Sequence, residues 1–533
     1  MVPNFSSNAV FILTSVVLLV IYLLKERFRY WTKRGVPSVS PLECLKGFGF
    51  IFRASHGMDW FMKMHDGLAG EKFGGAWMLL QPILVIRDPE LIRMCMIKEF
   101  SSFHDRNPPT GTENDVLAEN LFQLTGDRWR QVRYKLSAAF SSAKLKIMFQ
   151  TLKDCSNNLN AYIENLASKT GSAEIDVKKL MSNYTLDVIG ACAMGIKCNA
   201  IQDPNCEFGR ITKQIFKFSW RRSLTLILEL AHPKLPNLVG LKVLDPEISD
   251  YLQRIVKDTM ALKDADQSSS RKDFLQIMMN LRDVEPEEPE DEENVGALPQ
   301  ENGGTRMEKK EAGHGGSKGP LISESIILGV ISVFTSAGYE PVSATLTFAL
   351  YELAQNPDVQ ERMFEEIRSV KAKLGDDLTY ESLKKFKYTE QVIHETQRKR
   401  TVAGALLRMC TEPFMMPDSS VLVEKGTRVL IVTDAIHKDP KYFPEPGKFN
   451  PDRFSEENID KIVPGTYLPF GDGPRFCIGM RLAIMDVKTA LITVVSNYKV
   501  LPCAKTPKEI KYDKAGFMLS ADGPVYLRLE KRK

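Results

Sequence analysis

One cysteine lies in a segment whose spacing suits it to hold a thiolate against a metal. Residues 470–479 read Phe-Gly-Asp-Gly-Pro-Arg-Phe-Cys-Ile-Gly, and an apolar stretch from Ile478 to Val495 follows Cys477. A helix over that stretch would place the positive end of its dipole beside the sulfur and stabilise the thiolate. Gly473 and Gly479 permit tight turns that direct backbone amides at the sulfur. The segment therefore predicts a thiolate ligand.

The same segment resembles the haem-binding signature of the cytochrome P-450 family, Phe-x-x-Gly-x-Arg-x-Cys-x-Gly. The resemblance implies that Cys477 is the axial ligand of the iron of haem b. It also implies that Arg475 pairs with a haem propionate and that Phe470 shields the ligand from water. Gly479 belongs to the same cofactor-binding set. A thiolate axial ligand favours O–O cleavage, so the expected chemistry is oxygen activation.

Further candidate cofactor residues occur in the order that the family shows. Trp129 and Arg133 are four residues apart and share one face of an expected helix. The resemblance implies that both contact a haem propionate. It implies the same for Arg408, in a short strand, and for Arg106. An exposed strand arginine remains the alternative for each of the two.

A second group of residues is expected to brace the cysteine loop. Glu395 and Arg398 lie three residues apart on a helix, and Arg453 occurs in the segment Phe449-Asn-Pro-Asp-Arg-Phe454. Bidentate arginines are tolerated in a protein interior only when every member is paired, so the three side chains predict a buried structural network. The pair His394-Glu395 does not continue as a zinc-protease helix, because Arg398 stands where the second histidine would be.

The segment Ala337-Gly-Tyr-Glu-Pro-Val-Ser343 departs from the family. Most oxygen-activating members have a threonine at the position of Pro341, whose hydroxyl organises a chain of water molecules for proton delivery. Proline removes that hydroxyl and a backbone amide, and we expect it to reinforce a local break in the helix. Glu340 remains as the candidate catalytic acid. Ser343 would point about 200° away on a regular helix, so it could replace the threonine only if a break re-aims it.

A second departure follows the Glu395 helix. Residues 398–404 read Arg-Lys-Arg-Thr-Val-Ala-Gly, which predicts a more charged and more flexible turn than the proline-rich turn of relatives. The candidate substrate-pocket residues, which include the residues just after this turn, are Ala337, Tyr339, Ala403, Leu407, Phe517 and Met518.

Composition limits the class of protein. The 533 residues are 43% hydrophobic and 26% charged with a net charge of +4, which is ordinary for a globular enzyme and gives no general affinity for nucleic acid. The nine cysteines are scattered and disfavour a disulfide framework or a structural zinc site. The resemblance implies one catalytic domain over residues 42–533, mainly α with small β-sheets, in the cytochrome P-450 fold.

The N-terminal residues predict a membrane anchor. The stretch from Phe5 to Leu24 is uncharged and long enough to cross a bilayer as a single transmembrane helix. Basic residues follow it, so the positive-inside rule places the rest of the chain in the cytosol. The segments are thus residues 1–24 as anchor and 25–41 as a basic, proline-containing hinge, at the endoplasmic reticulum membrane. A cleaved signal peptide is the alternative.

Residues 283–320 form an acidic insertion. The run Asp283–Glu293 carries eight acidic residues and no basic one, and the residues that follow it cannot bury a core. We interpret the segment as a disordered surface insertion. An acidic recruitment segment is the functional alternative.

The sequence therefore predicts a membrane-anchored haem-thiolate monooxygenase acting on a lipophilic small molecule. By resemblance, electrons come from NADPH through a membrane-bound NADPH-cytochrome reductase, with cytochrome b5 as an additional donor. The docking face is expected to include Arg128, Arg130, Lys135, Lys144 and Lys146. Pro341 leaves two alternatives open: a haem-thiolate isomerase or dehydratase that acts on a peroxide, or a non-catalytic haem-binding relative.

Overall fold

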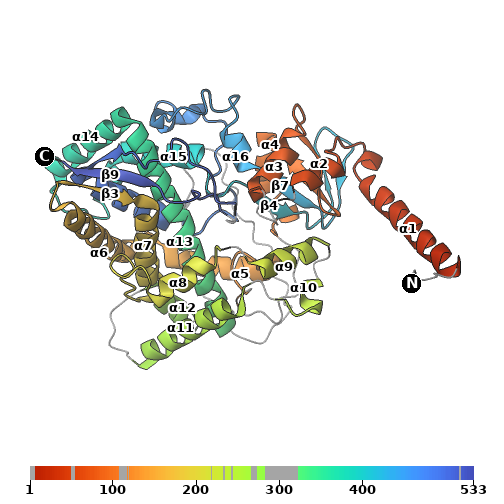
Figure 1. Cartoon of the computed structure of the whole chain (residues 1–533), viewed down its shortest axis with the longest axis horizontal. Helices are drawn as coiled ribbons and strands as arrows, with labels where there is room; N and C mark the ends of the chain where they lie inside the picture. The colour runs from red at the N-terminus through yellow and green to blue at the C-terminus, as the bar shows by residue number, and fades with distance from the viewer. Residues whose placement is uncertain are drawn as a thin grey trace, which may run out of the picture.

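The computed structural model describes residues 7–47, 49, 55–106, 117, 119–217, 219–231, 235–241, 244–265, 273–282, 322–514 and 518–532. The acidic insertion predicted at residues 283–320 and the candidate pocket residue Phe517 lie outside them. The fold is mainly α-helical with small β-sheets, as the sequence predicts (Figure 1).

The helices form most of the body. Their bounds are α1 Ser7–Phe28, α2 Pro41–Lys46, α3 Gly57–Asp66, α4 Pro89–Arg93, α5 Gly126–Ser137, α6 Ser142–Ala167, α7 Val177–Ile189, α8 Glu207–Gln214, α9 Trp220–Ala231, α10 Leu235–Leu238, α11 Pro246–Ala265, α12 Phe274–Arg282, α13 Glu324–Gln355, α14 Pro357–Leu374, α15 Lys387–Lys399, α16 Thr433–His437 and α17 Met480–Asn497.

The strands form three sheets. Their bounds are β1 Phe73–Met78, β2 Gln81–Ile86, β3 Ser172–Asp176, β4 Leu406–Met409, β5 Phe414–Met415, β6 Leu422–Val423, β7 Arg428–Ile431, β8 Tyr498–Pro502 and β9 Tyr526–Lys531. The four-stranded sheet has the order β1-β2-β7-β4, the three-stranded sheet β3-β9-β8, and β5 pairs with β6. The first two sheets lie on opposite sides of the body (Figure 1).

The four-stranded sheet joins strands that are far apart in the sequence, β1 and β2 from the N-terminal part of the chain and β4 and β7 from its C-terminal part. Strand β2 runs parallel to β7 with Ile83 opposite Arg428, and β4 is antiparallel to β7 with Leu406 opposite Ile431. The sheet therefore connects β4, which carries Arg408, through β7 to the N-terminal strands β1 and β2. Apolar side chains of β2 and β7 are buried and form a core cluster of their own.

Helix α13 is the central element of the larger core (Figure 1). It packs against α7, α17 and α15, and most of its side chains from Val342 to Ala354 are fully buried. The helix is uninterrupted through Pro341, so the expected local break is not observed. The side chain of Thr345 donates to the Pro341 carbonyl at 2.8 Å, one turn along the helix. Proline removes an amide, but packing against α7, α15 and α17 holds the helical backbone.

Helix α1 projects away from the body (Figure 1). Its apolar side chains are exposed, for example Phe11 at 74% and Leu18 at 61%. The hinge after it is docked: Trp31 is buried and donates from its indole to the Ala76 carbonyl at 3.1 Å. Val39 donates its backbone amide to Gly75 at 2.9 Å. The hinge therefore continues the edge of β1.

Among the described residues, α13 is long and apolar enough to cross a membrane by length and composition alone. More than half of its most apolar window (56%) is buried inside the protein. Because the central helix of a large core has the same composition, this result describes the core.

Candidate active site

The loop before α17 carries the sulfur of Cys477. The amide of Cys477 donates to the Phe470 carbonyl at 2.9 Å, which closes the loop, and Gly479 precedes the first turn of α17. Gly473 has a φ of +65°, and a Cβ at this position would lie 1.8 Å from the Met96 carbonyl oxygen. Only glycine fits there. Cys477 itself remains half-buried.

Two opposing effects act on the Cys477 thiol. Burial raises its pKa, whereas the backbone amide of Gly479 and the guanidinium groups of Arg133 and Arg106 lower it. The amide and the two cations stabilise the charged form of the sulfur, and a bound metal ion would deprotonate it outright. The environment therefore suits a thiolate ligand.

Arg475 is buried and held by several acceptors. Its Nε donates to the His104 carbonyl at 2.7 Å, and its Nη2 donates to the Leu124 carbonyl at 2.8 Å and to Asp105 Oδ1 at 3.2 Å. The guanidinium lies 4.0 Å from the centre of the Trp129 ring. Burial lowers the pKa of Arg475 to about 9. Arg475 and Trp129, both predicted to contact a propionate, thus pack on one another.

Three further arginines gather around Arg475 and Cys477. Arg106 donates from Nη2 to the Arg475 carbonyl at 2.9 Å, and Arg133 lies over the Phe476 ring at 4.8 Å. Burial lowers the pKa of Arg106 and of Arg133 to about 10. Burial and the charges of Arg106 and Arg475 hold the pKa of Arg408 well below its usual range. Residues from four separate segments thus form one cationic cluster.

The cluster fits an anionic cofactor. Asp105 and Asp472 act on Arg475 and Arg408, so four guanidinium groups outnumber these two carboxylates by two. Arg408 Nε is buried without a hydrogen-bond partner among the described residues. Unpaired buried cations are costly. The two propionates of a haem would supply two negative charges, beside a cysteine able to bind its iron.

Helix α13, which carries Glu340 and Pro341, has one face that is not fully buried. Ala337 is exposed and Pro341 is half-buried, whereas the residues of α13 from Val342 to Ala354 are buried. The two residues are four apart and lie on the same side of the helix. Opening of this face is consistent with a cavity there, and a proline at position 341 offers it no hydroxyl.

Glu340 and Tyr339 border a different space. Together with Ser182, Ser343 and Ser520 they line a polar cavity of about 30 Å³ between α13, α7 and the C-terminal segment. The hydroxyls of Tyr339 and Ser182 are 2.8 Å apart. Burial raises the pKa of Glu340, and a hydrogen bond from Ser520 and the charge of Lys178 act against it. The cavity is large enough for about one water molecule.

The three residues of the predicted structural network are in contact. Arg398 donates from Nε to Glu395 Oε2 at 2.7 Å and from Nη2 to Oε1 at 2.8 Å, and both side chains are fully buried. Arg453 Nε lies 3.4 Å from Glu395 Oε1. Arg398 also donates to the His437 carbonyl at 3.0 Å. The network therefore ties α15 to the segments on either side of α16.

The charged turn after α15 differs from its sequence-based expectation. Instead of a flexible exposed turn, Lys399 and Arg400 each place a nitrogen 2.8 Å from a carboxylate oxygen of Glu352, and Thr401 is fully buried. Glu352 lies on α13, 1% exposed. Sequence reasoning missed this acid, because its distance of 47 residues from Lys399 gives no local signal.

The remaining pocket candidates are partly brought together. Ala403 and Leu407 are half-buried on either side of Gly404, where a Cβ would lie 3.1 Å from the Leu519 side chain. Met518 is half-buried and adjoins Leu519, whose amide donates to the Val402 carbonyl at 3.0 Å. The C-terminal segment therefore packs beside the 402–407 segment.

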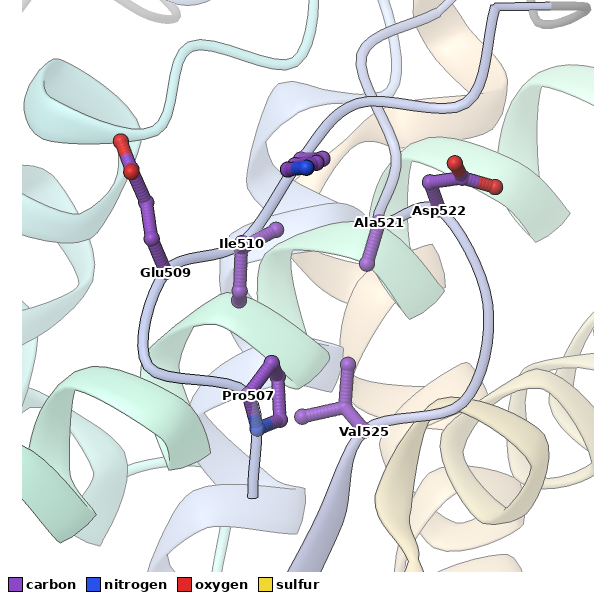
Figure 2. A pocket seen from close by; sticks show the side chains of 7 residues that line it. Pro507, Glu509, Ile510, Ala521, Asp522 and Val525 are labelled. Carbon is purple, nitrogen blue, oxygen red and sulfur yellow. The ribbon is translucent and has the colours of Figure 1, made fainter. Parts of the chain in front are cut away.

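A larger cavity lies elsewhere. It measures about 220 Å³ and lies between the segments Pro507–Lys511 and Ala521–Val525 (Figure 2). Pro507, Ile510 and Val525 line its apolar side. No predicted substrate-pocket residue that the structure describes takes part in it, so it is separate from the cysteine site.

The fold and the cysteine loop define a class of protein, and the comparison with protein families agrees. The family model for cytochrome P450 matches residues 48–301 and 306–527. The chain belongs to the cytochrome P450 family and is a monooxygenase, an oxidoreductase that incorporates molecular oxygen, and haem is the family's cofactor.

Known relatives cover nearly the whole chain. It is 33% identical over 527 residues to cytochrome P450 6a2 of Drosophila melanogaster, covering 98% of this chain and 99% of the relative. It is 33% identical over 535 residues to cytochrome P450 9e2 of Blattella germanica, with 97% of each covered. Cytochrome P450 6k1 of the same cockroach is 30% identical over 528 residues, covering 98% of this chain and 97% of the relative.

Proposed function

We propose that this protein is a membrane-anchored monooxygenase that oxidises a lipophilic small molecule with electrons from NADPH, delivered by a membrane-bound reductase. The observation that carries the proposal is the cluster of Arg106, Arg133, Arg408 and Arg475 around the Cys477 loop. Its two uncompensated charges and its thiol match the propionates and the iron of one haem.

In this proposal each residue of the cluster has one task. Cys477 would bind the iron, and the arginines and Trp129 would hold the propionates. Phe470 would shield the sulfur from water, and the backbone amide of Gly479 stabilises its charged form. When bound, a thiolate-ligated haem supplies the activation of dioxygen. The protein's own part is to orient the cofactor and the substrate and to deliver protons.

Glu340 is the proposed proton source on the distal side. Burial raises its pKa and so favours the protonated form, and Ser520 and Ser343 lie beside it. Pro341 leaves the open face of α13 without a hydroxyl. We therefore expect protons to arrive less directly than in relatives with threonine, and more of the NADPH to be consumed without product.

Membrane anchoring is supported by α1, which extends outside the body (Figure 1) and whose apolar side chains are exposed. A helix of 22 residues is long enough to cross a bilayer. The basic residues Lys25 and Arg27 in its last turn favour a cytosolic catalytic domain at the endoplasmic reticulum.

The proposed reductase-binding face includes the start of α5 and of α6. Arg128, Arg130 and Lys146 are about half exposed or more and pair with the surface acids Glu119, Asp127 and Glu381. Lys135 and Lys144 are half-buried. An acidic partner, such as the reductase or cytochrome b5, would exchange these weak surface pairs for its own.

The test uses the full-length protein in lipid with the reductase and NADPH. The proposal predicts NADPH consumption coupled to oxygenation of a lipophilic substrate. Conversion of an organic peroxide without NADPH would favour an isomerase or dehydratase, the alternative that Pro341 raises. Binding of haem without either activity would favour a non-catalytic protein.

The variant Pro341→Thr tests the proposed effect of Pro341 on proton delivery. Restoring the hydroxyl should raise the ratio of product to NADPH consumed, while the affinity for haem stays unchanged. The matched control is Val342→Thr, which adds a hydroxyl one position along the same helix. An unchanged ratio in Pro341→Thr would count against the proposed effect of Pro341.

A further inference from the structure

We propose that Glu352 and Arg400 form a clamp that positions the pocket wall formed by residues 403–407 and so determines which lipophilic molecules fit beside the haem. The inference rests on the function proposed above and adds a specificity-determining pair to it. Neither residue touches the cofactor loop, so both are positioning residues.

The clamp is a short, buried, charge-assisted contact. Arg400 Nε donates to Glu352 Oε1 at 2.8 Å, and Lys399 Nζ donates to Glu352 Oε2 at 2.8 Å. The side chain of Glu352 is 2% exposed, against 15% for Arg400 and 20% for Lys399. Such contacts between ionised groups are stronger than neutral hydrogen bonds, and water screens this one little. One carboxylate therefore fixes two successive side chains.

The clamp joins the distal helix to the end of α15. Glu352 lies in the last turns of α13, within the run of fully buried residues that packs against the core. Arg400 follows α15, and its amide donates to the Thr396 carbonyl at 2.7 Å. The start of the 400–404 segment is thus set from α13 and from α15 at once.

Hydrogen bonds also hold the residues that link Arg400 to the pocket wall. The hydroxyl of Thr401 lies 3.0 Å from His437 Nδ1. The carbonyl of Ala403 accepts from Thr433 Oγ1 at 2.7 Å, and that of Gly404 accepts from the Asp434 amide at 3.0 Å. Hydrogen bonds therefore hold the segment between Arg400 and β4 at Thr401, Ala403 and Gly404, and a change at the clamp acts on the wall through this segment.

The turn has no proline to stiffen it. A proline-rich turn fixes φ covalently, whereas residues 398–404 contain no proline and end in glycine. The buried ion pair replaces that covalent stiffness with an electrostatic contact. A consequence is that the wall depends on the charges of the turn, so it can be moved by a substitution outside the pocket.

The experiment measures the binding of two probes to the haem-loaded protein by absorbance. Imidazole reaches the iron and is too small to meet the wall, whereas phenylimidazole extends toward it. The variants are Glu352→Gln, Arg400→Gln and the double variant. The matched control is Arg362→Gln, which removes an arginine that pairs with Asp452 at the surface of α14, with side chains 53% and 43% exposed.

The clamp predicts that Arg400→Gln changes the ratio of the two dissociation constants by about tenfold, the lower range for one lost apolar contact. Arg362→Gln should leave the ratio unchanged. Because Arg400 acts through Glu352, which also holds Lys399, Arg400→Gln should add little to Glu352→Gln in the double variant. Hydrogen exchange of the amides of residues 400–404 should speed up in the same variants and not in the control.

Three results would overturn the inference. The first is an unchanged ratio of the two dissociation constants together with unchanged hydrogen exchange of residues 400–404. The second is full additivity of the two substitutions. The third is an equal loss of affinity for both probes in Arg400→Gln, which would mean that the clamp supports the haem cavity as a whole. If the unsubstituted protein failed to bind imidazole at all, the proposed function would fail instead. The exchange of residues 400–404 would still test the clamp.

Discussion

Arg106 donates a hydrogen bond to the backbone carbonyl of Arg475 at 2.9 Å, two residues before Cys477. The contact joins positions 369 residues apart and places one guanidinium against the peptide that carries another. Burial and the charge of Arg106 both lower the pKa of Arg475, and a bound anion would oppose them by stabilising its charged form. The relationship therefore defines the haem site better than either arginine does alone.

Arg408→Met should have opposite effects on the protein with and without haem. Without haem, removal of a buried and uncompensated cation should raise the free energy of unfolding by about 1 kcal/mol. With haem, the loss of a propionate partner should speed cofactor dissociation by roughly tenfold. Urea titration of the haem-free protein and transfer of haem to an acceptor protein measure the two. Destabilisation of both forms alike would contradict the assignment of Arg408.

Gly473→Ala should prevent the cysteine loop from closing. A Cβ at Gly473 would lie 1.8 Å from the Met96 carbonyl oxygen, and φ is +65°. We expect little haem in the purified variant. Gly447→Ala is the control, because a Cβ there meets nothing within 4 Å. The ratio of haem absorbance to protein absorbance is the measurement, and a normal ratio in Gly473→Ala would show that the loop has another conformation.

Glu395→Gln should cost about 3 kcal/mol in the free energy of unfolding, because it leaves the fully buried Arg398 and its neighbour Arg453 without a charged partner. Glu456→Gln removes an exposed acid that pairs with Lys387, and it should change the urea midpoint little. Similar effects of the two substitutions would contradict a buried structural network.

A pH dependence is expected from Asp486 on α17. Burial raises its pKa to about 7, and Tyr184 donates to its Oδ1 at 2.7 Å. Since the folded pKa exceeds the unfolded value, the folded state binds the extra proton between about pH 4 and pH 7. Stability is highest below this window and is lost as the pH rises through it, at no more than about 1.4 kcal/mol per pH unit.

Asp486→Asn should remove that loss. The variant should match the unsubstituted protein near pH 4 and exceed it by a margin that grows up to about pH 7, because the amide never ionises. Denaturant titrations at four pH values between 4 and 7 measure the difference. A constant difference across this range would mean that Asp486 does not titrate in it.

Local spacing predicted much of the site. The offsets around Cys477, the pair Glu395 and Arg398, and the strands at β6 and β7 are signals carried by neighbouring residues. The class of enzyme that these motifs implied is confirmed by the family match. Helical content could be predicted because apolar periodicity is also local.

Long-range pairing could not be predicted in the same way. The charged turn after α15 reads as flexible, yet Glu352, 48 residues before Arg400, fixes it. Pro341 reads as a helix break, yet packing keeps α13 continuous. In each case a tertiary contact outweighs the local preference.

The central claim is that Cys477 holds a haem through its thiolate. The most direct test is the absorbance spectrum of the reduced protein treated with carbon monoxide, for the unsubstituted protein, Cys477→Ser and the control Cys503→Ser. We predict the spectrum of a thiolate-ligated haem in the first and the last, and its absence in Cys477→Ser. A thiolate spectrum that persists in Cys477→Ser, or none in the unsubstituted protein, would contradict the claim.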